Sequence, residues 1–140
     1  MWQLWRVLSS EPYQSKLRSK SPDLRPTEDR QGNYIITAGE RVIVKPGDAP
    51  TGIVFRDQSF LVVYEKWSKE PDELLSYRYH YQRPGSWFVR YDMHETELPG
   101  HPKHHLQASS LGEGIRLPTG EVKSEDVLET IVEQFVGADV

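Results

Sequence analysis

The chain contains no cysteine, which excludes a disulfide framework and a thiolate metal site. It also lacks any apolar run near the ~20 residues that a membrane-spanning helix needs. The first residues do not join a basic segment to a long apolar one, as a secretory signal does. We therefore expect a cytoplasmic protein without a membrane segment.

Basic residues are not in excess either. Lys and Arg number 17 against 21 Asp and Glu, and this balance disfavours broad nonspecific binding of nucleic acid. The charge is uneven, because residues 121–140 hold one basic and six acidic side chains. The familiar catalytic motifs are missing too: there is no phosphate-cradling glycine loop, no Gly-x-Ser-x-Gly and no His-Glu-x-x-His. A function must therefore be sought in clusters of residues.

Short β-branched and aromatic runs separated by Gly, Pro and Asp predict a series of strands. These runs lie at residues 34–37, 41–45, 52–56, 60–67, 75–81, 87–92 and 104–107. The run 60–67 is apolar on both faces, which predicts a central strand. Residues 1–12 predict a short helix that docks on the core. The basic segment 13–33 fits either a solvated loop or an arm that contacts phosphate.

One helix is predicted with clear signals near the C-terminus. Ser124 opens it and can cap it, the acidic residues that follow suit the positive end of its dipole, and Gly137 can end it. Its apolar stripe, typical of a helix packed on a core, is Val127, Leu128, Ile131, Val132, Phe135 and Val136. The predicted fold class is α+β, an antiparallel β-meander of about five to seven strands with this helix packed on one face. We find no linker or repeat, so we expect residues 1–140 to form a single domain.

Residues 75–92 predict a β-hairpin with its turn at 83–86, followed by a loop that holds four of the five histidines. On the first arm the three tyrosines alternate with polar residues, which puts Arg78 and His80 on one face. The tyrosines Tyr77, Tyr79 and Tyr81 are interpreted as core residues, with base stacking as the alternative. The loop histidines are His94, His101, His104 and His105.

Paired histidines can cleave RNA without a metal ion, because one removes the 2′-hydroxyl proton and the other protonates the leaving 5′-oxygen. A cation then stabilises the charged phosphorane. The candidate catalytic residues are His104, His105, His101 and His94, with Asp92 to orient a histidine. The candidate substrate-binding residues are Arg90, Lys103, Arg78, His80 and Tyr91. Within a strand, His104 and His105 point to opposite faces, so we expect only one of them to face the site.

Other interpretations of the histidine segment stay open. His101, His104 and His105, with Asp92 or Glu95, are residue types that zinc or manganese accepts. The segment also fits a solvated loop without chemistry. Arg90 and Asp92 project to the same face and fit either an ion pair that fixes the loop or the functional roles above.

Several of these features together resemble the TumE family of prokaryotic toxins. They are the run 76–81, the strand end Arg90-Tyr91-Asp92, the loop ending in His104-His105, and the closing helix; the resemblance covers residues 53–136, with 1–50 as an N-terminal extension. Members of this family often carry a His-His-x-His run at the end of the loop, and the matching run here, 104–107, ends in Gln107 instead of His.

The resemblance implies the toxin of a toxin–antitoxin pair, with a cognate antitoxin of the helix-turn-helix type as its partner. Combined with the histidines, it predicts a ribonuclease that acts on RNA and needs no cofactor. The alternatives are a non-catalytic protein-interaction module, a metal-dependent nuclease and a nucleotidyl-transferring toxin. A homodimer remains open.

Overall fold

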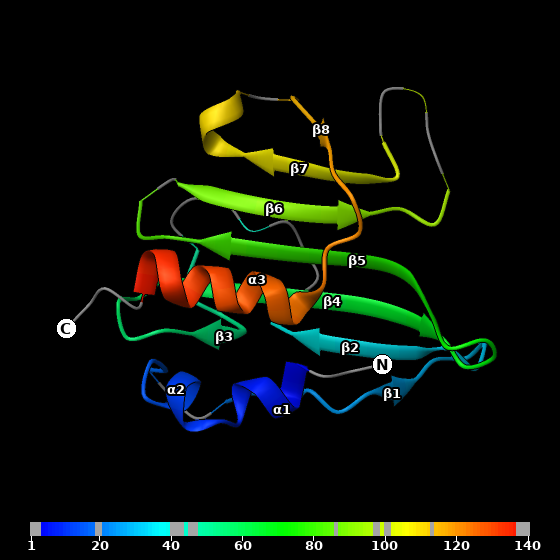
Figure 1. Ribbon diagram of the computed structural model, residues 1–140, viewed down its shortest axis with the longest axis horizontal. Helices are drawn as coiled ribbons and strands as arrows, with labels where there is room; N and C mark the ends of the chain where they lie inside the picture. The colour runs from blue at the N-terminus through cyan, green and yellow to red at the C-terminus, as the bar shows by residue number, and fades with distance from the viewer. Residues whose placement is uncertain are drawn as a thin grey trace.

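A computed structural model of the chain describes residues 4–18, 21–39, 44, 48–85, 87–96, 99, 102–112 and 114–136. Within these residues, eight strands form one antiparallel sheet and three α-helices pack around it (Figure 1). The strands are β1 (Thr27–Glu28), β2 (Tyr34–Ala38), β3 (Ile53–Val54), β4 (Phe60–Ser68), β5 (Glu73–Gln82), β6 (Phe88–Met93), β7 (His104–Ala108) and β8 (Leu117–Pro118). The helices are α1 (Leu4–Leu8), α2 (Glu11–Gln14) and α3 (Ser124–Ile131), with a 3₁₀ turn at Ser109–Leu111 and a π turn at Val132–Val136.

The strands follow one another across the sheet in the order β1-β2-β4-β5-β6-β7-β8, and β3 also pairs with β4. Successive strands from β4 to β8 are neighbours, as expected for a meander. The helix α3 lies across β4 and β5, while β6, β7 and β8 extend beyond it (Figure 1). The predicted α+β class, with the C-terminal helix on one face of the sheet, is confirmed.

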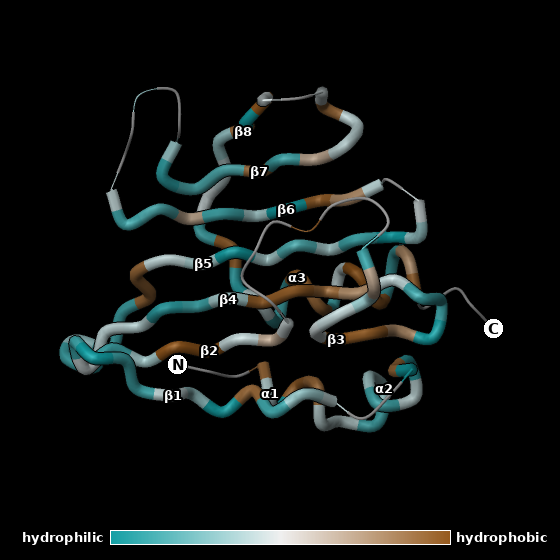
Figure 2. The backbone as a smooth tube through the Cα atoms, turned by 180° about the vertical axis from the view of Figure 1, so that it is seen from behind, coloured by the Kyte–Doolittle hydropathy of each residue, from teal (hydrophilic) through white to brown (hydrophobic). Residues whose placement is uncertain are grey.

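Strand β4 is central, as its two apolar faces predicted. It pairs with β2 and β3 on one side and with β5 on the other. Its first half is hydrophobic (Figure 2), and Phe60 and Leu61, which point to opposite faces, are both buried. The strand expected at 41–45 lies outside the described residues, apart from Val44.

The C-terminal helix begins at Ser124, as predicted, and its apolar stripe is confirmed: five members are buried and Phe135 is partly buried. The capping prediction is wrong by one residue. The N-cap position belongs to Lys123, and the Ser124 hydroxyl bonds to the Glu125 carboxylate. Ser124 is already the first residue with helical geometry, so its hydroxyl does not cap the helix. Gly137 lies outside the described residues.

The N-terminal segment adds to the same core. Helix α1 buries Leu4 and Leu8, which confirms the short docking helix expected there. The segment after it is not purely solvated, since Leu17 and Leu24 are buried and Leu17 bridges to Phe55. In the part of the chain that is described, no helix combines the length and apolar character required to cross a bilayer.

Candidate functional site

Strand alternation divides the side chains of β5 between two faces. The buried rings on one face are Tyr77, Tyr79 and Tyr81. The Tyr81 ring lies 5.5 Å from that of Phe135, so this face is the one covered by α3 and its continuation. The tyrosines are therefore core residues. Arg78 and His80 project from the opposite face of the sheet.

The strand register gathers polar side chains on that opposite face. The opposed pairs are Arg78 with Asp92, His80 with Arg90, Asp92 with His105, and Arg90 with Gln107. We call these six residues the arginine–histidine face. Arg78 and His80 share this surface with Arg90 because the β5–β6 register places His80 opposite Arg90 and Arg78 opposite Asp92.

A row of hydrogen bonds across three strands fixes the guanidinium of Arg90. Its Nε donates to Nδ1 of His80 at 3.0 Å, and its NH1 donates to Oε1 of Gln107 at 3.4 Å. The group also lies over the Phe88 ring, 5.5 Å from its centroid. Gln107, which replaces the last histidine of the family run, is thus a partner of Arg90.

The same row defines the tautomer of His80. Because its Nδ1 accepts from Arg90, the proton is on Nε2, which donates to Oε1 of Gln82 at 3.1 Å. Burial lowers the pKa of His80 to about 4, and the charges of Arg90 and Arg78 act in the same direction. A neutral, buried His80 positions Arg90 and is unsuited to acid–base chemistry near neutral pH.

This arrangement predicts an acid-sensitive contribution to stability. In the unfolded chain a histidine has a pKa near 6.5, against about 4 for folded His80. Between these values the unfolded state binds the additional proton, so stability decreases as the pH falls. We expect the unfolding free energy to fall by about 3 kcal/mol from this group between pH 6.5 and 4. In His80→Gln, urea unfolding across this range should show a correspondingly shallower fall, and parallel curves would contradict the assignment.

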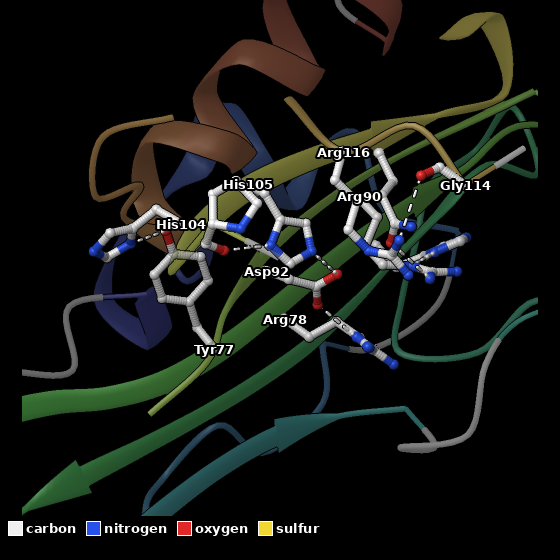
Figure 3. A network of polar contacts seen from close by, with 11 residues as sticks. Tyr77, Arg78, Arg90, Asp92, His104, His105, Gly114 and Arg116 are labelled. Atoms are coloured by element: carbon white, nitrogen blue, oxygen red, sulfur yellow. Dashed lines mark hydrogen bonds and ion pairs between the residues drawn. The ribbon is translucent and has the colours of Figure 1, made fainter. Parts of the chain in front are cut away.

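Asp92 lies between an arginine and a histidine. Its Oδ1 accepts from Nε of Arg78 at 2.6 Å, and its Oδ2 lies 3.5 Å from Nε2 of His105 (Figure 3). The other ring nitrogen of His105, Nδ1, donates to the Pro102 carbonyl oxygen at 2.9 Å. Because that oxygen can only accept, Nδ1 carries a proton, and Nε2 is the ring nitrogen that faces the carboxylate. The ion pair of Asp92 is therefore with Arg78, not with Arg90.

A second histidine lies against the first. The rings of His94 and His105 are 5.2 Å apart, with 32° between their planes. His94 follows β6 on the arginine–histidine face and is half-buried, whereas His105 is 1% exposed. Two imidazoles, a carboxylate and two guanidiniums thus come together from three strands.

A third guanidinium approaches this face from the edge of the sheet. Arg116 precedes β8, whose pairing places Pro118 opposite His105. Arg116 therefore continues the register next to Gln107, and its side chain points toward Arg90 in Figure 3. Neither Arg90 nor Arg116 forms an ion pair with a described residue. Burial and the charge of Arg78 lower the pKa of Arg90, as expected where cations gather.

Some predicted site residues lie elsewhere. His104 and Tyr91 project toward the α3 side; His104 Nδ1 lies 3.0 Å from the Tyr77 hydroxyl, which accepts from the Val122 amide. His104 and His105 thus point to opposite faces, as their adjacency in a strand predicted. Lys103 is half-buried, and its carbonyl accepts from the His94 amide. His101 lies outside the described residues.

Three features carried no prediction from the sequence: Arg116, Gln82 and a buried carboxyl group in the core. Glu65 is 3% exposed on the α3 side and accepts hydrogen bonds from the Tyr79 hydroxyl at 2.6 Å and the Trp67 indole at 3.1 Å. Burial raises the pKa of Glu65. Residues 61, 63 and 65 of a strand point to the same side, so the sequence indicated that Glu65 shares a face with Leu61 and Val63. Because Glu65 is on the α3 side, it is separated by the sheet from the histidines.

No group of three His, Cys, Asp or Glu side chains within the described ranges is placed to hold a metal ion. The metal interpretation included His101, which lies outside the described residues.

The fold and this site define a small α+β protein in which one sheet face packs on a helix and the other carries guanidinium and imidazole groups. A protein-family model described as Toxin TumE matches residues 30–136, so the chain belongs to the TumE toxin family. Membership implies the toxin of a toxin–antitoxin system, with a cognate antitoxin as partner. The match begins at residue 30, so the family region includes β2 and is longer than the resemblance over 53–136. No match was found among curated proteins or solved structures.

Proposed function

We propose that this toxin is a ribonuclease that cleaves RNA at the arginine–histidine face, in the cytoplasm and without a metal ion. The observation that carries the proposal is the contact between His94 and His105 beside Asp92, with Arg78 and Arg90 on the same face. Histidines supply proton transfer near neutral pH, and arginines bind phosphate, so the cluster has the groups that RNA cleavage needs.

In this reaction a histidine takes the proton of the 2′-hydroxyl, and the 2′-oxygen attacks phosphorus. The bond to the 5′-oxygen breaks, and the second histidine gives that oxygen a proton. The products are a 2′,3′-cyclic phosphate and a free 5′-hydroxyl. We assign the two transfers to His94 and His105. Because His105 is buried in the free protein, this assignment requires that RNA binding uncover its ring.

The arginines differ in how neighbouring side chains hold their guanidinium groups. Arg78 uses Nε to bind Asp92, and its side chain is 32% exposed, which leaves its terminal nitrogens facing outward. Arg90 is held by His80 and Gln107. Arg78, Arg90 and Arg116 would hold the scissile phosphate and stabilise the charge of the phosphorane. Arg90 would enter the reaction already oriented, because its partners fix it beforehand.

The direct test uses purified protein and a defined RNA oligonucleotide, with and without EDTA. We expect cleavage that continues in EDTA and yields products with a 2′,3′-cyclic phosphate and a 5′-hydroxyl. An oligonucleotide with 2′-deoxyribose at the cleaved position should remain intact, because it lacks the attacking oxygen. Cleavage that stops in EDTA would overturn the metal-free mechanism. Intact RNA that carries an added nucleotide would overturn the ribonuclease assignment in favour of nucleotide transfer.

A further inference from the structure

On the α3 side, the outer strands of the sheet carry an apolar surface that the helix does not cover. Strands β6, β7 and β8 direct seven side chains to this side, and all but His104 are apolar: Val89, Tyr91, Met93, His104, Leu106, Ala108 and Leu117. Tyr91 pairs with Leu106, and Leu106 with Leu117, so the apolar row runs to the edge of the sheet. Leu117 is 42% exposed. Sheet faces of this composition are normally covered by another layer.

A groove of about 500 Å³ lies between these strands and α3. Its floor is formed by Val89, Tyr91 and Ala108, and its helix wall by apolar Ile131 and the exposed polar Thr130. The groove is thus an apolar trough with one polar rim, a shape and composition that suit a protein segment with one apolar side.

The charge around the groove indicates which occupant fits. Residues 121–136 hold five acidic side chains and one basic one, and Asp126 lines the groove itself. A nucleic acid would be repelled here. A second copy related by twofold symmetry would bring the same acidic helix against this one, which is unfavourable as well. The complementary occupant is an apolar segment flanked by Lys or Arg.

We propose that this groove is the docking site for the cognate antitoxin, which inserts an apolar segment with basic flanking residues between α3 and the outer strands. The proposal rests on membership of the toxin family and does not depend on the ribonuclease assignment. The sheet separates this groove from the arginine–histidine face. The docked antitoxin and the candidate active site therefore occupy opposite faces of the sheet.

The test measures the affinity of the purified toxin for the purified antitoxin encoded beside its gene, by isothermal titration calorimetry. Two charge reversals form a matched pair, since Asp126 on α3 lines the groove and the exposed Glu133, in the π turn that continues α3, does not. We expect Asp126→Lys to weaken binding at least about tenfold and Glu133→Lys to leave it within about twofold. Thr130→Tyr, which adds a ring to the helix wall, should weaken binding without a change of charge.

The controls separate the alternatives. Arg78→Ala alters the opposite face and should bind antitoxin as the wild type does, whether or not the protein cleaves RNA. Normal binding by both Asp126→Lys and Thr130→Tyr, together with loss in Arg78→Ala, would overturn the proposal and place the antitoxin on the arginine–histidine face. A toxin dimer at micromolar concentration that the steric variant Thr130→Tyr dissociates, seen by analytical ultracentrifugation, would overturn it in favour of a second copy. Circular dichroism of each variant confirms that it is folded.

Discussion

His105→Ala is expected to lower the rate of RNA cleavage by at least about 100-fold, the lower end of what one proton-transfer group contributes. The ring of His105 contacts His94 and faces Asp92, so its loss removes one of the two proposed proton carriers. The measurement is kcat/KM on a defined RNA oligonucleotide, under conditions in which urea unfolding shows the variant to be folded.

The neighbouring histidine provides the matched control. His104 is adjacent in sequence, but its ring contacts Tyr77 on the α3 side of the sheet. We expect His104→Ala to stay within about threefold of the wild-type rate, because that ring is outside the proposed catalytic cluster. Equal losses in the two variants would show that the effect of His105 is structural. No loss in either would exclude the histidine mechanism.

A pH profile distinguishes catalysis from positioning. A proton carrier gives kcat/KM an ionisation limb, and that limb should be missing from the residual activity of His105→Ala. His94→Ala should remove the other limb. If the profile of each variant is simply lower than that of the wild type and unchanged in shape, neither histidine transfers a proton.

The composition of the two sheet faces was predictable from sequence, because a strand exposes alternate residues to alternate sides. That periodicity placed the three tyrosines opposite Arg78 and His80, and it separated His104 from His105. The hairpin turn brought β5 and β6 together, and with them the neighbourhood of Arg78, His80 and Arg90. Local pattern was sufficient for these features.

The contacts between distant segments were not predictable in the same way. Gln107 stands where the family run has its last histidine, and the sequence did not indicate that its amide oxygen accepts a hydrogen bond from Arg90 across the β6–β7 pair. Arg116 carried no signal at all, since a two-residue strand at the edge of the sheet places it. Glu65 lay on a recognisable face, but its burial depends on α3, which comes far later in the chain. These features follow from tertiary packing, which local periodicity does not encode.

Leu128→Ala is expected to cost about 2–5 kcal/mol of unfolding free energy, the range for a leucine truncated in a packed core. Leu128 is 0% exposed on the face of α3 that packs on the sheet, so its removal leaves a cavity between helix and strands. The measurement is urea unfolding at neutral pH. Thr130→Ala on the same helix provides the control, and because Thr130 is exposed we expect a change within about 0.5 kcal/mol.

The same variant tests whether the two faces of the sheet act separately. Leu128 and the arginine–histidine face lie on opposite sides, and the hydrogen bonds that hold Arg90 run between strands. At temperatures where Leu128→Ala is still folded, RNA cleavage per folded molecule should therefore match that of the wild type. For the stability of Leu128→Ala, a decrease in unfolding free energy of less than about 1 kcal/mol would contradict the packing of α3 on the sheet, because leucine truncation costs more in a well-packed core. A loss of cleavage without unfolding would show that α3 controls the opposite face, and an antitoxin bound against α3 would then have a route to inhibit the toxin without touching its active site.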